Sequence, residues 1–432
     1  MSHWPRFFRV HQKFDAPVVN DVVRATIETL GKLDLRQRVK PGESVAITAG
    51  SRGIAHIAEI LKAVVEHFKQ LDARPFIVPA MGSHGGGTAE GQLKVLRGYG
   101  ITPEFCGCEI RASMETVVVS QAAEGFAVHF DKHAFEADHV FVAGRIKPHT
   151  RFAGEIESGL MKMMLIGLGK HEGAKIYHRA IVNHSFDQIV RSVAREVLDR
   201  CAVCGGLAIL ENAYDQTAKI EAVAPECFET REPELLIQAK RWLARLPFER
   251  ADILFLDHIG KEISGAGMDT NVVGRKWNDH EALEHETPKV KRICVRGLSP
   301  ATHGNAIGLG LAEFCLTRVI DAMDVNVTRI NSLTGSHPTA GMIPFDYPND
   351  AEMLEAAVQT VGLVEPESLR ILWSQDTLHL GEIECSEAYW EQAQQRDDLE
   401  VLVSPRSLPL SESGLLPDCL LYTSPSPRDI GE

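Results

Sequence analysis

In the N-terminal half of the chain, short apolar runs alternate with longer segments whose apolar residues recur at helical spacing. Four runs have the length and composition of buried β-strands: SVAIT (44–48), PFIVPA (75–80), HVFVAGRI (139–146) and GLAIL (206–210). The segments from Ile57 to Leu71 and from Phe186 to Val197 have the spacing of one helix face. Strands that alternate with helices in this way predict a parallel α/β domain.

The pattern restarts after a charged helix, expected at about 232–245, and a Leu-Pro pair at 246–247. Three further runs predict strands: ADILFLDHIG (251–260), RICVRG (292–297) and RILWS (370–374). The glycine-rich segment HGNAIGLGLAE (303–313) is interpreted as a turn that leads into a helix near 306–323. We therefore expect a domain boundary near residues 246–250.

The predicted fold class is α/β, with two α/β domains, mostly parallel sheets, and a cofactor and substrate cleft between the domains. The N-terminal domain, residues 1–247, is expected to bind the cofactor and carry the catalytic groups. The C-terminal domain, residues 248–416, is expected on the substrate side. Residues 417–432 are rich in Ser and Pro and lack periodic apolar positions, so they are interpreted as a non-native tail.

Composition and charge exclude several classes of protein. Of the 432 residues, 44% are hydrophobic and 24% are charged, as is ordinary for a globular enzyme. The 59 acidic and 45 basic residues give a net charge of −14, which argues against nucleic acid or an anionic membrane as a partner. Because we find neither an apolar run of membrane-spanning length nor a signal-like core, we expect a cytoplasmic protein. The nine cysteines, with one CxxC at 201–204, are interpreted as reduced thiols.

Three predicted strands end in turns that combine Gly or Pro with a basic or imidazole side chain: AGSRG (49–53), MGSHGGG (81–87) and GRIKPHT (144–150). Ligands of open α/β sheets bind beyond the carboxyl ends of the strands, and glycine turns let backbone N–H groups approach an anion. The chain has neither a G-x-x-x-x-G-K-[ST] motif nor a G-x-G-x-x-G after its first predicted strand, which argues against nucleoside triphosphate and NAD sites.

Residues 145–179 are locally basic. Seven Lys or Arg against three Glu give this segment a charge of +4 within an acidic chain, and it also contains His149, His171 and His178. A basic, histidine-rich segment after a strand end suits an anionic ligand such as a phosphate or a carboxylate. Lys162 lies in the Met-rich run SGLMKMMLIG, where a lysine is costly to bury unless it is paired or modified.

The segment GRIKPHTRFAGEIESGLMKMMLIGLGKHEGAKIYH and the turn GSHGGGT resemble the nickel-dependent lactate racemase family of 2-hydroxyacid racemases and epimerases. The resemblance covers most of residues 15–400 and indicates a branch distinct from lactate racemase itself. It implies an isomerase with a nickel-pincer nucleotide, a pyridinium-3,5-bisthiocarboxylic acid mononucleotide whose sulfur arms hold nickel. It also implies a small-molecule 2-hydroxy acid as substrate and cofactor-biosynthesis proteins as partners.

The resemblance assigns the acid/base roles to His84 and His149, one on each face of the substrate. The Cα–H of a 2-hydroxy acid is hardly acidic, so inversion is easier if hydrogen leaves as hydride to give a flat 2-keto acid. Each enantiomer's hydroxyl then needs a base on its own side, and an imidazole can take and return a proton near neutral pH.

The remaining expected site residues hold the cofactor, the metal and the substrate. Lys162 would be the covalent tether of the cofactor, which Arg52, Gly85 and Gly86 would also bind. His178 would be the nickel ligand, with His171 as its competitor. The residues expected to bind the substrate are Arg52 and Lys261.

Two other functions stay open. AGSRG follows a strand and precedes a helix, the context of a nucleophile elbow, so Ser51 is a candidate nucleophile of a serine hydrolase. Asp376 and His379 follow it in the order such a triad uses. The third possibility is a non-catalytic protein that binds the nickel cofactor. The sequence leaves the substrate's side chain, the oligomeric state and the role of HGNAIGLG open.

Overall fold

The computed structural model describes residues 4–51 and 53–417, and the chain divides into two compact units. One unit is formed by residues 15–243, and the other by residues 1–14 together with the chain from residue 244 onward. The chain therefore crosses between the units twice. Both units combine helices with sheets that are largely parallel, which confirms the predicted α/β class. The expected cleft stays a prediction.

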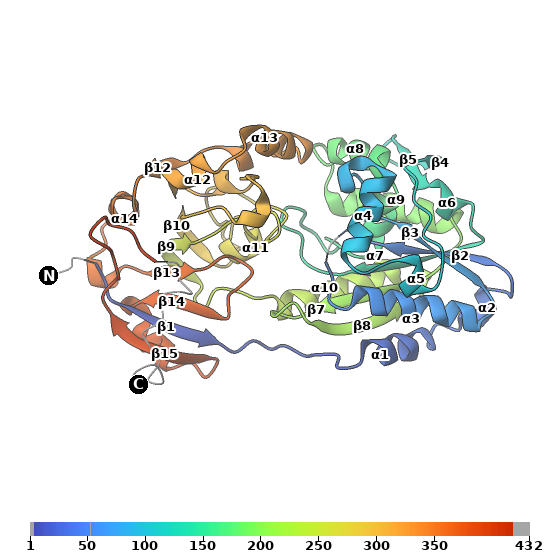
Figure 1. Cartoon of the computed structure of the whole chain (residues 1–432), viewed down its shortest axis with the longest axis horizontal. Helices are drawn as coiled ribbons and strands as arrows, with labels where there is room; N and C mark the ends of the chain where they lie inside the picture. The colour runs from blue at the N-terminus through green and yellow to red at the C-terminus, as the bar shows by residue number, and fades with distance from the viewer. Residues whose placement is uncertain (1–3, 52, 418–432) are drawn as a thin grey trace. The chain divides into compact units, whose positions relative to one another are not determined.

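The unit of residues 15–243 is built on a five-stranded sheet with the order β3-β2-β6-β7-β8 (Figure 1). Its strands are β2 (Ser44–Ala49), β3 (Arg74–Pro79), β6 (His139–Arg145), β7 (Val203–Glu211) and β8 (Thr217–Val223). The first four strands in the sheet are parallel, and β8 pairs antiparallel with β7 at one edge. The four runs predicted as strands in this half of the chain all lie in this sheet.

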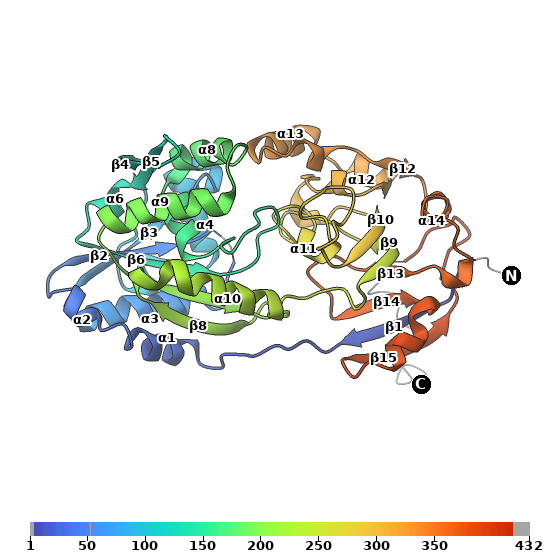
Figure 2. The ribbon, with the colours of Figure 1, turned by 180° about the vertical axis from the view of Figure 1, so that it is seen from behind.

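Helices cover both faces of this sheet, because alternate side chains of a strand point to opposite faces. Val45 and Ile47 of β2 pack in one apolar cluster with residues of α1 and α3, whereas Ala46 packs in the other with residues of α9 and α10. Figures 1 and 2 show these helices around the sheet from opposite sides. The longer helices are α1 (Val22–Leu30), α3 (Ile57–Gln70), α4 (Ala89–Gly98), α8 (Lys170–Ala180), α9 (Phe186–Arg200) and α10 (Phe228–Trp242).

Short elements complete this unit. A separate antiparallel hairpin, β4 (Thr116–Gln121) and β5 (Ala127–Asp131), contacts α8 and α9. The short helices are α2 (Leu35–Arg38), α5 (Pro103–Cys106), α6 (Lys132–Phe135) and α7 (Leu160–Lys162). α7 continues directly into a π-helical turn at Met163–Gly167.

The other unit contains an eight-stranded mixed sheet with the order β12-β11-β10-β9-β13-β14-β1-β15. The strands are β1 (Phe7–Gln12), β9 (Arg250–Leu256), β10 (Lys289–Val295), β11 (Phe314–Leu316), β12 (Phe345–Tyr347), β13 (Ile371–Ser374), β14 (Glu382–Ser386) and β15 (Leu399–Arg406). The helices are α11 (Thr270–Val273), α12 (Thr317–Asp321), α13 (Val325–Thr334), α14 (Asp350–Val358) and α15 (Trp390–Gln394).

The first strand belongs to this second unit, which differs from the expected N-terminal domain of residues 1–247. β1 lies between β14 and β15 and pairs antiparallel with both. Phe7 and Phe8 on this strand are buried in the core. The pairing joins residues that are almost a whole chain length apart, so local periodicity contains no signal for it.

The prediction of a helix near residues 306–323 is wrong. This stretch contains a short 3₁₀ turn at Leu309–Leu311, then β11, and only then the short helix α12. Gly308 has a φ of +95°, and a Cβ at Gly310 would lie 1.8 Å from the carbonyl oxygen of Thr339. The glycines of HGNAIGLG therefore permit a tight turn against a neighbouring backbone, and they do not pack a helix.

The last described residues of the chain are hydrogen-bonded to the core of this unit. Arg296 is fully buried, forms ion pairs with Asp257 and Asp350, and donates to the carbonyl oxygens of Leu416 and Pro417. Of the expected non-native tail, all residues after Pro417 lie outside the described residues.

Two further sequence expectations concern the cysteines and the membrane. The eight described cysteines are free, as expected, and burial raises the pKa of Cys201 and Cys204 to about 12. Within residues 4–51 and 53–417, we find no helix long and apolar enough to span a bilayer.

Candidate active site

Three strands of the five-stranded sheet end side by side at one edge. β2, β3 and β6 are parallel neighbours, so their carboxyl ends lie together (Figure 1). The turns that follow them contain Ser51, His84 and His149 respectively. The structure thus brings the two candidate acid/base histidines to the same edge of one sheet. Arg52, in the first of these turns, lies outside the described residues.

The turn after β3 positions His84 through both its side chain and its backbone. The Oγ of Ser51 forms a hydrogen bond with Nδ1 of His84, and Tyr99 donates its hydroxyl to the carbonyl oxygen of Ser51 at 2.8 Å. The buried side chain of Gln92 donates to the carbonyl oxygens of Gly82 and His84 at 3.0 and 3.4 Å. These contacts hold the Nδ1 side of the His84 ring and the backbone of the turn in place.

The glycines that follow His84 all adopt positive φ angles, of 68°, 68° and 65° at Gly85, Gly86 and Gly87. A Cβ at Gly85 would lie 2.6 Å from the backbone nitrogen of Gln92, so this glycine is required by packing. A Cβ at Gly86 would meet no atom within 4 Å. The exposed backbone at Gly86 is therefore the part of the turn that an anionic group can approach.

The turn after β6 fixes the ring of His149. Its Nδ1 accepts hydrogen bonds from the backbone N–H groups of Arg151 and Phe152, at 3.1 and 3.0 Å, and its own backbone N–H donates to Glu157 at 2.8 Å. A nitrogen that accepts two N–H bonds carries no proton. Neutral His149 in this conformation therefore has its proton on Nε2.

Phe152 brings three predicted site residues together. The ring of His149 stacks on Phe152 with centroids 4.1 Å apart and an interplanar angle of 7°. The ammonium of Lys162 lies 5.3 Å from the centroid of the same ring, and the ring of His178 lies 6.4 Å from it. The candidate base, cofactor tether and nickel ligand are thus grouped around one aromatic side chain.

This grouping depends on a break in the helical segment that contains Lys162 and His178. These residues are 16 positions apart, so in one continuous α-helix they would be separated by about 24 Å and rotated by about 160°. Instead, α7 passes into the π-helical turn, and Lys170 at the start of α8 has a φ of +53°. The break allows both side chains to reach Phe152.

The environment of His178 favours its neutral form. Burial lowers the pKa of His178, and the positive charges of Lys162 and Arg151 lower it further. A neutral imidazole has a free lone pair and can bind a metal ion. Among the described residues, no three His, Cys, Asp or Glu side chains gather into a metal site of their own. A metal held by one imidazole together with a cofactor's sulfur atoms is compatible with this arrangement.

His171, the competitor of His178, has different surroundings. Its Nδ1 is buried and lacks a hydrogen-bond partner, and a Cβ built on Gly87 would lie 3.6 Å from that nitrogen. His171 therefore lies against the glycine turn, whereas His178 lies beside Phe152. This placement supports His178 as the candidate ligand.

Lys261 belongs to the other unit. Its ammonium donates to Oδ1 of Asn331 on α13 at 2.7 Å, and its backbone N–H donates to Oγ1 of Thr302 at 3.1 Å. The structure describes this unit by itself, so the role of Lys261 toward a substrate stays a prediction.

The residues of the proposed hydrolase triad, Ser51, Asp376 and His379, are divided between the two units, so the triad stays a prediction. Nδ1 of His379 pairs with Asp376 at 2.8 Å within one unit, whereas Ser51 is bonded to His84 within the other. The histidine partner of Ser51 is therefore His84.

Phe152, Glu232 and Lys170 were missed as site residues. Phe152 lies three residues after His149, but a lone aromatic residue is by default interpreted as part of the core. Glu232 on α10 is fully buried, accepts from the backbone N–H of Met161 at 3.0 Å, and burial raises its pKa to about 7. A carboxylate within a charged helix pattern gives no sequence signal of such burial.

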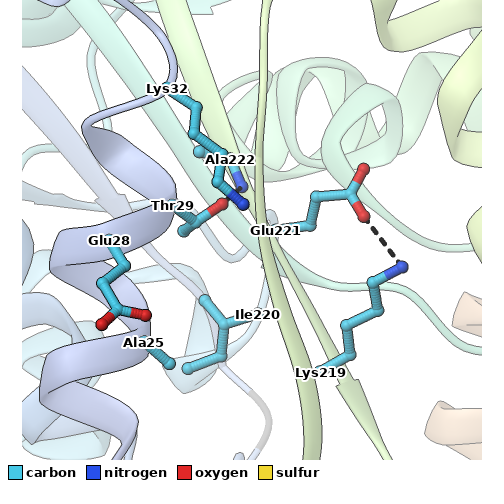
Figure 3. Close-up of a pocket in the computed structure, with 8 residues that line it drawn as sticks. All are labelled: Ala25, Glu28, Thr29, Lys32, Lys219, Ile220, Glu221 and Ala222. Atoms are coloured by element: carbon cyan, nitrogen blue, oxygen red, sulfur yellow. Dashed lines mark hydrogen bonds and ion pairs between the residues drawn. The ribbon is translucent and has the colours of Figure 1, made fainter.

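A hollow of about 430 Å³ lies elsewhere, between α1 and β8 (Figure 3). Glu221 pairs there with Lys219 at 2.9 Å, and with Arg231 at 2.6 Å, so that the pKa of Glu221 falls to about 2. The residues that line it are Ala25, Glu28, Thr29, Lys32, Lys219, Ile220, Glu221 and Ala222. None of the candidate site residues is among them.

Comparison with known proteins agrees with the resemblance seen in the sequence. Residues 10–189 match the family model described as the lactate racemase N-terminal domain. The chain is similar to the solved lactate racemase apoprotein from Thermoanaerobacterium thermosaccharolyticum, with a TM-score of 0.52 and 11% identity over 85% of this chain and 94% of that chain. A Thermotoga maritima protein gives a TM-score of 0.46 and 13% identity over 63% of this chain and 70% of that chain. No curated protein matches. Residues 10–189 therefore resemble the lactate racemase N-terminal domain, and the chain shares the fold of the lactate racemase apoprotein.

Proposed function

We propose that the protein is a racemase or epimerase of a 2-hydroxy acid. The observation that carries the proposal is the grouping of His149, Lys162 and His178 around Phe152, at the strand edge that also contains His84. The family match over residues 10–189 includes all of these residues and supports an isomerase. Arg52 and Lys261 are proposed to bind the carboxylate of the substrate.

The residues present fit a nickel-pincer nucleotide. Lys162 supplies an amine for the tether, neutral His178 supplies a nitrogen ligand, and the turn at Gly85 and Gly86 supplies backbone that an anionic group can approach. When bound, the cofactor supplies an acceptor for hydride from Cα of the substrate.

The two histidines would handle the proton of the substrate's hydroxyl at their Nε2 atoms. A serine hydroxyl can donate or accept, so the bond from Ser51 permits His84 to present either a lone pair or an N–H at Nε2. The turn around His149 allows only the N–H form, because two backbone groups donate to its Nδ1. For His149 to accept a proton at Nε2, Arg151 and Phe152 must first release its ring.

Metal content and catalysis test the proposal directly. Protein purified from cells that synthesise the cofactor is expected to contain nickel and a mass adduct at Lys162, and to exchange deuterium at C2 of at least one acid in a panel of enantiopure 2-hydroxy acids, sugar acids included. Lys162→Ala should lose the adduct. His84→Ala should keep the adduct but lose the exchange. Wild-type protein with neither nickel nor adduct would refute the proposal.

A second candidate function rests on the hydrogen bond between Ser51 and His84. A serine hydrolase would need that pair as nucleophile and base. A fluorophosphonate probe distinguishes the two functions, because it would label the wild type and not Ser51→Ala if Ser51 were a nucleophile. In the racemase we expect no labelling, and we expect Ser51→Ala to lower turnover. Bound nickel without turnover of any acid would indicate a non-catalytic cofactor-binding protein.

A further inference from the structure

Lys170 is a buried lysine in an unusual backbone conformation. Its side chain is fully buried, and its φ of +53° lies in the left-handed region that favours glycine. It marks the break in the segment between Lys162 and His178, where α8 begins. Neither the acid/base pair nor the cofactor tether of the proposed function uses it.

The ammonium of Lys170 connects three elements. It lies 2.8 Å from Oδ2 of Asp131, which is also fully buried, at the end of β5. It also donates to the backbone carbonyl of Pro79, the last residue of β3. Asp131 is itself fixed, because its Oδ1 caps α6 by accepting from Ala134 at 2.8 Å.

The contact with Pro79 lies at the base of the turn that contains His84. The backbone N–H of Gly82 in this turn donates to the carbonyl oxygen of Gly167, at 3.3 Å. A Cβ at Gly167 would lie 2.9 Å from the carbonyl oxygen of Ala80. The His84 turn and the helix break at 167–170 are therefore packed backbone to backbone, and the ammonium of Lys170 joins them.

A lysine is unfavourable at this position unless its charge is needed. Glycine would relieve the backbone strain, and methionine would suit the buried surroundings. Burial lowers the pKa of Lys170, while the neighbouring carboxylate of Asp131 opposes this and favours the charged form. Strain and a buried charge at one residue are typical of sites where geometry serves function.

We propose that Lys170 is a positioning residue, whose ammonium, paired with Asp131, sets the His84 turn against the segment that contains Lys162 and His178. The relevance of this geometry to catalysis rests on the proposed function, but the geometry itself does not. Without the ammonium, the His84 turn would keep its backbone hydrogen bond from Gly82 to Gly167 but lose the side-chain contact that fixes it against that segment.

Hydrogen exchange of the full-length chain without cofactor tests the positioning. In Lys170→Met and Lys170→Gly, amides of residues 80–87 and 163–180 should exchange at least tenfold faster, and Lys170→Arg should restore much of the protection. Because an unpaired buried charge on Asp131 destabilises the single variants, the double variant Lys170→Met/Asp131→Leu removes both charges. This double variant should fold and still exchange faster in the same two segments.

Arg9→Met is the matched control, because it removes a buried cation from an ion pair in the other unit, where Arg9 lies 2.7 Å from Glu384. It should leave exchange at residues 80–87 unchanged. If the double variant protects both segments within twofold of the wild type, or if Arg9→Met exposes them equally, the proposal is wrong.

The catalytic consequence is measured separately on cofactor-loaded protein. Lys170→Met should lower kcat for C2 exchange at least tenfold with a smaller change in KM, and Lys170→Arg should recover part of kcat. An unchanged kcat would overturn the catalytic part of the proposal. If the wild type exchanges no acid, the proposed function fails, while hydrogen exchange still decides the positioning role.

Discussion

At the scale of single residues, the site is organised by side chains that do no chemistry themselves. The ring of His149 stacks on Phe152, and the ammonium of Lys162 lies over the same ring. Phe152 is itself held by stacking on Phe186, with ring centroids 4.2 Å apart. Ser51 orients the ring of His84 through a hydrogen bond to its Nδ1. The reactive groups are thus oriented by neighbours whose own positions are fixed by packing.

We predict that Phe152→Leu lowers the rate of C2 exchange about tenfold. The substitution keeps apolar volume but removes the stacking and the cation–π contact, which contribute about 0.5–1.5 kcal/mol each. Phe126→Leu is the control, since Phe126 contacts Tyr177 edge-on at 5.6 Å in the same unit. Equal losses of activity in both variants, measured at equal thermal stability, would contradict a specific role for Phe152.

At the scale of elements, the short helix α7 is held at its start by a buried acid. Glu232 of α10 accepts from the N–H of Met161, and a Cβ at Gly159 would overlap its carboxyl group. Backbone N–H groups at the start of a helix need acceptors, and α7 is too short to be stable alone. The position of Lys162 at the end of α7 therefore depends on Glu232.

We predict that the contribution of Glu232 to the stability of the wild type falls as pH rises from about 4.5 to about 7. Burial raises the pKa of Glu232 from its ordinary 4.5 to about 7, so in this range the folded state holds a proton that the unfolded state has lost. The rise corresponds to about 3 kcal/mol of unfolding free energy. Above pH 7 both states are ionised, and this contribution changes no further.

Glu232→Gln stays neutral and should remove this dependence. We expect urea denaturation at pH 5 and at pH 8 to show that the unfolding free energy of the variant, relative to that of the wild type, is higher by up to about 3 kcal/mol at pH 8. Glu234→Gln, on the exposed side of the same helix, is the control and should follow the wild type. If the difference in unfolding free energy between Glu232→Gln and the wild type is the same at both pH values, the pKa of Glu232 is not raised.

At the scale of the whole molecule, the first residues of the chain belong to the same unit as the chain from residue 244 onward, which we call the C-terminal unit. β1 fills the place between β14 and β15, so the first residues of the chain complete the sheet of the C-terminal unit. A sheet that loses an internal strand loses two ladders of hydrogen bonds and the buried Phe7 and Phe8.

We predict that deletion of residues 1–12 destabilises the C-terminal unit selectively. Limited proteolysis followed by mass spectrometry should find new cleavage at β14 and β15, while residues 22–242 stay protected. A deletion that exposes α3 and α9 to the protease as readily as β15 would show that the two units unfold together.

Much of the fold could be predicted from the sequence where the signal is local. SVAIT, PFIVPA and HVFVAGRI are predominantly apolar, as is typical of strands buried on both faces, and they form β2, β3 and β6. The place of β1 could not be predicted, because its partners lie more than 370 residues later. The segment 306–323 was misassigned because glycines that serve a tight turn look like glycines in a packed helix.

The candidate site was predictable in part. Residues at strand ends were identifiable, since a parallel sheet places those ends together, and His84 and His149 do lie at one edge. The proximity of Lys162 to His178 could not be predicted, because it depends on the π-helical turn and on the left-handed backbone conformation of Lys170. The partners Phe152, Lys170 and Glu232 act through contacts that only the folded chain creates.

The interior position of β1 also imposes an order of assembly during synthesis. A ribosome releases FFRVHQ first, yet its partners β14 and β15 emerge only after residue 382, on the order of tens of seconds later. The unit of residues 15–243 can complete its own sheet in that interval. Until then Phe7, Phe8 and Val10 have no partner strands to bury them, so the nascent chain exposes apolar surface that favours aggregation.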